Sequence, residues 1–285
     1  MSSKTTGNTS EEAPPPPLCS ILHELRTAEN SGGYFLPRLH SLKESDPNLK
    51  LLEVGSGWGH MTASLSKIIG PSGKVVGLDI DPSTLVHARR HAKNAGVESH
   101  TDFIQGDAYA IPFADETFDI THAHQVLAHM ERPWEVIREM VRVTKPGGFV
   151  AIREGDLESE VVWPKEPGLT KFHELIVKGM NMRGKGGGGA DTGRQLLPWA
   201  LRAGVDRTKA TLSYGTWWFD GAEDKDKWAK AMVGQVRGGT VGQVAVQLGL
   251  ASQEDLDEMA SAWEDWAKRD DSSLAMMHGE IVIEK

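Results

Sequence analysis

Short apolar runs alternate with helix-like segments through the middle of this 285-residue chain. The segments between the runs predict helices at Met61–Ile69, from Pro82 to about Asn94, and at Pro133–Val143. Strands that alternate with helices form a parallel sheet covered on both faces, so the pattern predicts an α/β fold. The strands are expected at residues 50–54, 74–79, 102–105, 118–123 and 149–153.

The rest of the chain is less regular. Residues 1–20 include four consecutive prolines and predict a disordered tail, with a docking segment for a proline-binding module as the alternative. The glycine-rich stretch Gly184–Gly193 predicts a mobile loop. Further elements are expected in this order: one or two short helices within 21–42, helices at 167–182 and 195–203, a strand at 210–219, mostly helix over 222–268, and a last strand at 279–284.

Composition limits the functional classes. Acidic residues outnumber basic ones by 40 to 31, which gives a net charge of −9 and argues against a general binder of nucleic-acid phosphates. The single cysteine, Cys19, rules out a disulfide framework and a cysteine-rich metal site, and we expect no metal. No apolar stretch reaches the roughly 20 residues that span a bilayer, and the polar start lacks the apolar centre of a signal peptide. We therefore expect a cytoplasmic protein.

A glycine loop follows the first strand. Gly55, Gly57 and Gly59 come directly after Val54 and before a helix, and glycines let the chain turn tightly and let a ligand approach the backbone. A dinucleotide fingerprint needs glycines at relative positions one, three and six, but the sixth position here is His60. The loop therefore predicts a nucleotide cofactor, and the spacing weighs against a nicotinamide dinucleotide.

The segment Glu53–Gly59 resembles motif I of the class I S-adenosylmethionine-dependent methyltransferases. Four further matches follow in the family's order, at Asp79, Gly106–Ala108, Phe118–Asp119 and Lys145–Gly148. The resemblance implies a Rossmann-like, seven-stranded, mostly parallel sheet with an antiparallel last strand, helices on both faces and a helical cover. It also implies an enzyme that uses S-adenosylmethionine and releases S-adenosylhomocysteine.

The resemblance assigns roles residue by residue. Main-chain N–H groups of the glycine loop would face the methionine part of the cofactor, and Glu53 would support its amino group or the loop. Asp79 would hold the ribose, with helix capping as the alternative, and Asp107 would bind the adenine amino group, with a local turn as the alternative. The candidate cofactor-binding residues are Tyr34, Glu53, Gly55, Ser56, Gly57, Gly59, Asp79, Ile80, Gly106, Asp107, Ala108, His124 and Gln125.

A less specific resemblance covers about residues 21–285. Arg26–Ser31 with Tyr34–Pro37, His122–Leu127 and the end of the chain are similar to the ubiquinone/menaquinone-type methyltransferases, from which Gly184–Gly189 departs as an insertion. This implies a small-molecule acceptor, aromatic or lipophilic. It also implies one methyltransferase domain over 21–285, with a cofactor-binding core at 50–153, a cover or substrate lid at 21–45 and 154–208, and C-terminal strands and helices at 209–285.

Three side chains after strands four and five are candidates for the acceptor side: His124, His129 and Asp156. Methyl transfer from a sulfonium is an in-line displacement that depends mainly on positioning, and a base is needed only when the nucleophile holds its proton strongly. An imidazole suits that work. Structural histidines and a solvated loop at Asp156 are the alternatives. Trp217, Trp228, Trp263 and Trp266 either line an acceptor pocket or pack the final helices.

Other functional classes stay open at this point. A non-catalytic cofactor-binding or regulatory protein could keep the same motifs. A protein or nucleic-acid methyltransferase is disfavoured by the negative charge and by the lack of an added recognition domain. A nicotinamide-dependent oxidoreductase is disfavoured by the glycine spacing. The oligomeric state is not indicated by the sequence.

Overall fold

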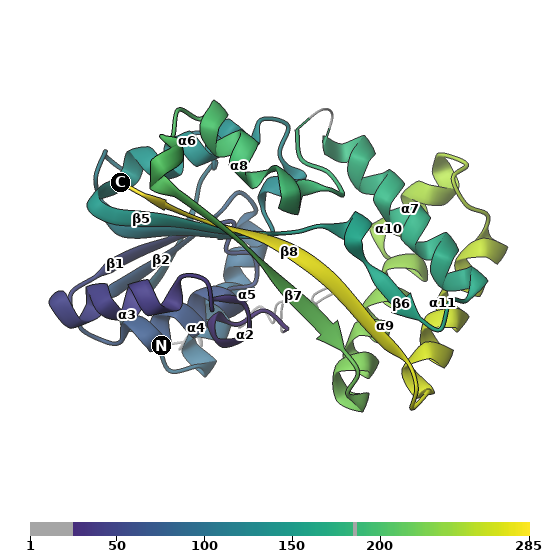
Figure 1. The fold of residues 1–285 in the computed structure, drawn as a ribbon. Helices are drawn as coiled ribbons and strands as arrows, with labels where there is room; N and C mark the ends of the chain where they lie inside the picture. The colour runs from purple at the N-terminus through teal and green to yellow at the C-terminus, as the bar shows by residue number, and fades with distance from the viewer. Residues whose placement is uncertain (1–24, 185–186) are drawn as a thin grey trace, which may run out of the picture.

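Five parallel strands form the centre of the structure, in the order β3-β2-β1-β4-β5 (Figure 1). The computed structural model describes residues 25–184 and 187–285, so the expected tail and Cys19 lie outside the described residues. The strand order reverses between β1 and β4, and open α/β sheets bind ligands at the carboxyl ends of the strands at such a point. The bounds are β1 Lys50–Val54, β2 Lys74–Asp79, β3 Thr101–Gln105, β4 Phe118–His124 and β5 Thr144–Gly155.

A long antiparallel strand completes the sheet. β8, Ser273–Glu284, pairs antiparallel with β5 on one edge and with β7, Ala210–Phe219, on the other. A short strand that the sequence does not predict, β6 at Val161–Trp163, pairs with the first residues of β8 beyond the end of β5. The α/β class and the antiparallel last strand are confirmed, and the sheet has eight strands where seven were expected.

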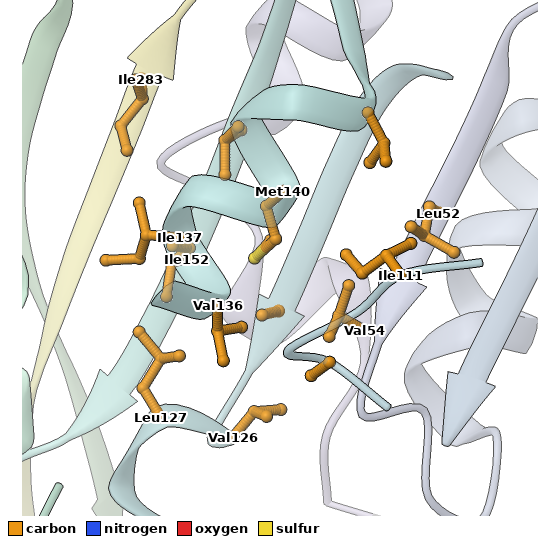
Figure 2. Close-up of a cluster of buried hydrophobic side chains, with 14 of the residues drawn as sticks. Leu52, Val54, Ile111, Val126, Leu127, Val136, Ile137, Met140, Ile152 and Ile283 are labelled. Atoms are coloured by element: carbon orange, nitrogen blue, oxygen red, sulfur yellow. The ribbon is translucent and has the colours of Figure 1, made fainter. Parts of the chain in front are cut away.

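Helices cover both faces of the sheet because successive strand residues point to opposite sides. Leu51 packs toward α2 (Ala28–Ser31), α3 (Leu36–Ser45) and α4 (His60–Ile69), and α5 (Pro82–Asn94) flanks them. Leu52 packs toward α6 (Pro133–Val143) and α8 (Thr192–Arg202). Figure 2 shows side chains of α6 packed against the strands: Val136, Ile137 and Met140 with Ile152 and Ile283.

Four further helices form a cover around the projecting half of β7 and β8, at the right of Figure 1. They are α7 (Pro167–Gly184), α9 (Ala222–Val236), α10 (Thr240–Gln247) and α11 (Gln253–Lys268). Trp263 and Trp266 are buried in this cluster, whereas Trp218 is 67% exposed, so the late tryptophans serve different purposes. None of the helices among the described residues is long and apolar enough to cross a membrane.

Several segments differ from the sequence expectation. β5 includes the Lys145–Gly148 turn and is longer than expected, and α8 belongs to the sheet layer rather than to a lid, since its Leu196 and Trp199 pack in the α6 cluster. The described part of Gly184–Gly193 is not a free loop. Gly188 N donates to Met130 O at 2.7 Å, and a Cβ on Gly188 would lie 2.2 Å from Leu127 O.

Close backbone contact between α8 and β8 predicts an effect on stability. A Cβ on Gly279 would lie 1.7 Å from Gly193 O, so one of the two backbones must move. We expect Gly279→Ala to lower the free energy of unfolding by about 3 kcal/mol, measured by urea denaturation. Gly33→Ala is the matched control, because a Cβ there meets nothing within 4 Å. Equal stability of the two variants would contradict the packing described.

Candidate functional site

A cavity of about 530 Å³ lies where the strand order reverses, and we call it the glycine-loop cavity. Its wall comes from the loops after β1, β2, β3 and β4, so side chains far apart in the sequence meet there. Arg26, His60, Met61, Leu78, Tyr109, Val126, His129 and Met130 complete the wall. The predicted cofactor residues that the structure brings together here are Glu53, Gly55, Ser56, Gly57, Asp79, Ile80, Gly106, Asp107, Ala108, His124 and Gln125.

The glycine loop is held in one conformation by β2. Gly55 and Ser56 donate backbone N–H bonds to Leu78 O at 2.8 and 2.9 Å, and Gly57 N donates to Asp79 Oδ2 at 2.7 Å. Gly55 has φ +72°, and a Cβ on it would lie 2.4 Å from Val126 Cγ2. Glycine is therefore required at position 55 both for the turn and for the close packing of the two loops.

The acidic side chains in the wall are fixed by local bonds. Glu53 is 2% exposed, and its Oε2 accepts from Thr62 Oγ1 at 2.7 Å. Asp79 Oδ1 accepts from Asp81 N at 3.0 Å, and Asp107 Oδ1 accepts from Tyr109 N at 2.8 Å. The local turn role left open for Asp107 is thus present, whereas the cap of α5 is Asp81 and not Asp79, and all three carboxylates line the cavity. Ile80 is 67% exposed beside them and offers an apolar surface for a flat ring.

A second cavity, of about 640 Å³, adjoins the first, and we call it the apolar chamber. Arg26, Gln125 and His129 line both cavities, so the two spaces meet at these residues. Trp217 and Trp228 belong to the chamber wall and also pack in the cluster of the helical cover, so they combine features of both alternatives. Most other wall residues are apolar and come from the helical cover, among them Phe172, Leu175, Ile176, Met180, Met232, Val244 and Leu248.

The loop after β4 carries the residues shared by the two cavities. Gln125 has φ +55°, and its Nε2 lies 3.0 Å from His278 Nε2. Glu154, fully buried at the end of β5, accepts backbone N–H bonds from Val126 and Leu127, both at 2.7 Å. Burial raises the pKa of Glu154 to about 7, against the effect of these bonds. Glu154 thus fixes the loop that presents Gln125 and His129.

Two candidate histidines face the cavities as neutral imidazoles. His124 is 5% exposed, has no hydrogen-bond partner for either ring nitrogen among the described residues, and has its pKa lowered well below 6.5 chiefly by burial. His129 ends the short helix Leu127–His129 and has an accessible side chain at the cavity wall. Enclosure by the wall, with Arg183 and Arg26 nearby, lowers the pKa of His129.

Three predicted site residues lie outside both cavity walls. Asp156 is fully buried and lines neither cavity, and Arg194 donates to each of its two oxygens at 2.6 Å. Gly59, with φ +80°, begins α4 and packs against Ala88 and Phe103. Tyr34 packs its ring on Phe35, and its buried hydroxyl has no hydrogen-bond partner among the described residues. These three positions differ from the sequence expectation.

Arg26 is a charged wall residue that the sequence does not predict. It belongs to the Arg26–Ser31 segment that carried the weaker resemblance, but nothing in that segment indicates that this residue lines two cavities. His60 was also missed, and burial lowers its pKa to about 4. In residues 25–184 and 187–285, no three His, Cys, Asp or Glu side chains are grouped to hold a metal ion.

Buried neutral histidines predict acid sensitivity. Burial lowers the pKa of His60 to about 4 and of His278 to about 2, and that of His124 well below 6.5. Below pH 6.5 the unfolded chain therefore binds protons that the folded chain does not, so stability rises with pH in this range. We expect the free energy of unfolding to fall as pH drops below about 6.5, by up to ~1.4 kcal/mol per pH unit for each histidine.

Urea denaturation at several pH values measures this slope. His278→Asn removes one of the titrating groups. It should therefore reduce the slope of the unfolding free energy against pH by the equivalent of about one bound proton. An unchanged slope in this variant, or a wild-type stability that stays flat under acid conditions, would count against the burial described.

The comparisons with known proteins agree with this geometry. A family model described as a methyltransferase domain matches residues 45–214, which is more than half of the chain. An uncharacterized methyltransferase of Schizosaccharomyces pombe is 32% identical over 279 residues, which is 92% of each chain. The ubiquinone/menaquinone biosynthesis C-methyltransferase UbiE of Cronobacter sakazakii is 37% identical over 105 residues, 37% of this chain and 42% of that enzyme. This chain therefore matches less than half of UbiE.

A solved structure shares the fold. The YcgJ protein of Bacillus subtilis superposes with a TM-score of 0.53 at 18% identity, covering 88% of this chain and 97% of that one. At this identity the likeness concerns the fold alone. The ordered motifs, the glycine-loop cavity, the family model and the full-length relative agree, and the chain belongs to the class I S-adenosylmethionine-dependent methyltransferases.

Proposed function

We propose that this methyltransferase acts on a small aromatic or lipophilic acceptor bound in the apolar chamber. The observation that carries the proposal is the shared wall: Arg26, Gln125 and His129 belong to both cavities, so a ligand in the chamber lies next to one in the glycine-loop cavity. A chamber of about 640 Å³ lies within the usual size of small-molecule sites. The UbiE resemblance supports the acceptor class and does not identify the acceptor.

The residues of the glycine-loop cavity suit the cofactor by their chemistry. S-Adenosylmethionine supplies an electrophilic methyl group on a sulfonium. Glu53 would accept from the amino group of its methionine part, Asp79 would accept from the ribose hydroxyls, and Asp107 would accept from the adenine amino group. Ile80 would pack on the adenine ring. Three carboxylates in one wall also complement a cofactor that carries positive charge.

His129 is the residue best placed to receive a proton from the acceptor. Its ring lies in both cavity walls, and its lowered pKa keeps it neutral near pH 7. His124 lines the glycine-loop cavity alone and would orient the reacting groups. Asp156 is not proposed for either role, because Arg194 holds both of its oxygens.

The remaining assignments are also proposals. We treat residues 21–285 as one functional unit, because the chamber draws its wall from positions as far apart as Arg26 and Met276. The net charge of −9 supports a partner that is not a nucleic acid. A cytoplasmic location is a prediction from composition only.

Filling the chamber tests where the acceptor binds. A Cβ on Gly179, in α7, meets nothing within 4 Å, so a larger side chain there would enter the chamber. We expect Gly179→Phe to weaken the chamber's binding of the neutral apolar dye N-phenyl-1-naphthylamine, and to raise the KM of an acceptor, by about 10-fold. Cofactor affinity, measured by calorimetry, should not change.

Gly179→Ala is the matched control and should bind the dye as the wild type does, with a more stable helix by about 1 kcal/mol. Acceptors are sought by measuring S-adenosylhomocysteine release across phenols, quinones and other lipophilic metabolites. No turnover on any member, together with intact cofactor binding, would favour the non-catalytic alternative. Unchanged dye and acceptor binding in Gly179→Phe would place the acceptor elsewhere.

The pH profile tests His129. For an acceptor that releases a proton, we expect kcat to fall as pH drops through the lowered pKa of His129, because the imidazolium cannot accept that proton. His129→Asn should reduce kcat by roughly 10²- to 10⁴-fold and abolish this acid limb. A variant that keeps both the wild-type rate and the acid limb would show that His129 is not the base.

A further inference from the structure

Arg26 is a cation without a partner in the wall of both cavities. Its Nε is buried and has no hydrogen-bond acceptor, and the guanidinium makes no ion pair, within the part of the chain that the structure describes. Burial lowers the pKa of Arg26 to about 10. The charge of Glu154 acts on Arg26, but that carboxylate already accepts from the backbone N–H groups of Val126, Leu127 and Ala128. Arg26 as a whole is partly buried, and a guanidinium whose Nε is buried without an acceptor is costly unless a ligand pairs with it.

The charges around the glycine-loop cavity are unequal. Its wall contains three carboxylates, of Glu53, Asp79 and Asp107, and among the described residues Arg26 is its single lysine or arginine. The wall histidines His60, His124 and His129 have lowered pKa values and stay neutral near pH 7. An anionic group that enters this cavity therefore has one positively charged partner among the described wall residues, and that partner is Arg26.

We propose that Arg26 binds the carboxylate of the cofactor's methionine part and thereby selects the intact amino acid. The cofactor carries one carboxylate, and Glu53 in the same wall is the complement for the adjacent amino group. A guanidinium matches a carboxylate with two parallel hydrogen bonds, which gives both charge pairing and a fixed orientation. Arg26 would thus be a positioning residue that holds the methionine part beside the entrance to the chamber.

The position of Arg26 also couples the two cavities. Arg26 forms part of the chamber wall, where an unpaired charge disfavours an apolar ligand. A carboxylate bound to Arg26 from the cofactor side neutralises that charge. Cofactor binding should therefore strengthen binding of a neutral apolar ligand in the chamber, and the reverse coupling must have the same size. This predicts that the cofactor and the acceptor bind with positive cooperativity.

A cofactor analogue tests the pairing without any acceptor. Calorimetry compares S-adenosylhomocysteine with its decarboxylated form, 5′-S-(3-aminopropyl)-5′-thioadenosine, on the wild type, Arg26→Gln and Arg26→Lys. We expect the wild type to prefer the intact ligand by at least about 10-fold, Arg26→Lys to keep part of this preference, and Arg26→Gln to bind both ligands equally. Arg26→Gln that keeps the full wild-type preference would overturn the proposal.

Two further measurements separate this role from a structural one. Removing an unpaired buried charge should leave the unfolding midpoint of ligand-free Arg26→Gln as high as that of the wild type or higher, whereas a structural arginine would lower it. Arg183→Gln is the matched control, since Arg183 lines the chamber but not the glycine-loop cavity, and it should keep the ligand preference. If Arg183→Gln lost the preference for the intact ligand, the assignment would be contradicted. It would also be contradicted if Arg26→Gln kept that preference and had a lower unfolding midpoint than the wild type.

The coupling has its own readout. S-Adenosylhomocysteine should increase the affinity of the chamber for N-phenyl-1-naphthylamine, and the decarboxylated analogue should not. Equal effects of the two ligands would contradict the coupling. Because cofactor preference is measured without an acceptor, failure here leaves the proposed acceptor class untouched, and failure of the Gly179 variants leaves the Arg26 assignment untouched.

Discussion

The close packing of two loops, after β1 and after β4, is the constraint on which the site depends. Gly55 approaches Val126 so closely that no side chain fits between them, and Glu154 holds the β4 loop through its backbone N–H groups. These contacts fix the glycine turn on one side of the crevice and Gln125 and His129 on the other. A cofactor in the crevice therefore meets a prearranged wall rather than a set of separate loops, which reduces the ordering cost of binding.

The second cavity owes its shape to the extension of β7 and β8 beyond the parallel sheet. Four helices pack around this extension, and the chamber lies between them and the carboxyl ends of the parallel strands. Trp217 joins the two regions, since it lies on β7, lines the chamber and packs its ring against His278 at a centroid distance of 4.6 Å. The chamber wall thus comes mainly from the cover, whereas the wall of the glycine-loop cavity comes mainly from the loops at the carboxyl ends of the strands.

Much of the sheet could be predicted because its elements have clear ends. The strands at 50–54 and 74–79 and the helices at 82–94 and 133–143 occur where expected, since glycines and prolines bound each apolar run. The cofactor wall followed from motif order, because parallel strands bring their carboxyl ends to one edge. β6 and the first half of β8 were missed, because they are held by pairing with each other and by the cover rather than by a local apolar pattern.

Side-chain partners were the part that the sequence could not reveal. Asp156 follows a strand in the same way as a catalytic acid would, but Arg194, 38 positions later, pairs with it. Arg26 looks like an ordinary helix-flanking cation in the sequence, and only the structure shows that its Nε has no acceptor among the described residues. Whether a charged residue is paired depends on residues distant in the chain, so motif spacing alone cannot separate a structural charge from a ligand-binding one.

The most direct test of the account is a crystal structure of the protein with S-adenosylhomocysteine bound. The account predicts that the adenine lies beside Asp107 and Ile80, that the ligand carboxylate pairs with Arg26, and that the sulfur faces the chamber between Gln125 and His129. A ligand whose sulfur points to bulk solvent, or whose path to the chamber is closed by protein, would contradict the central claim that the two cavities form one methyl-transfer site.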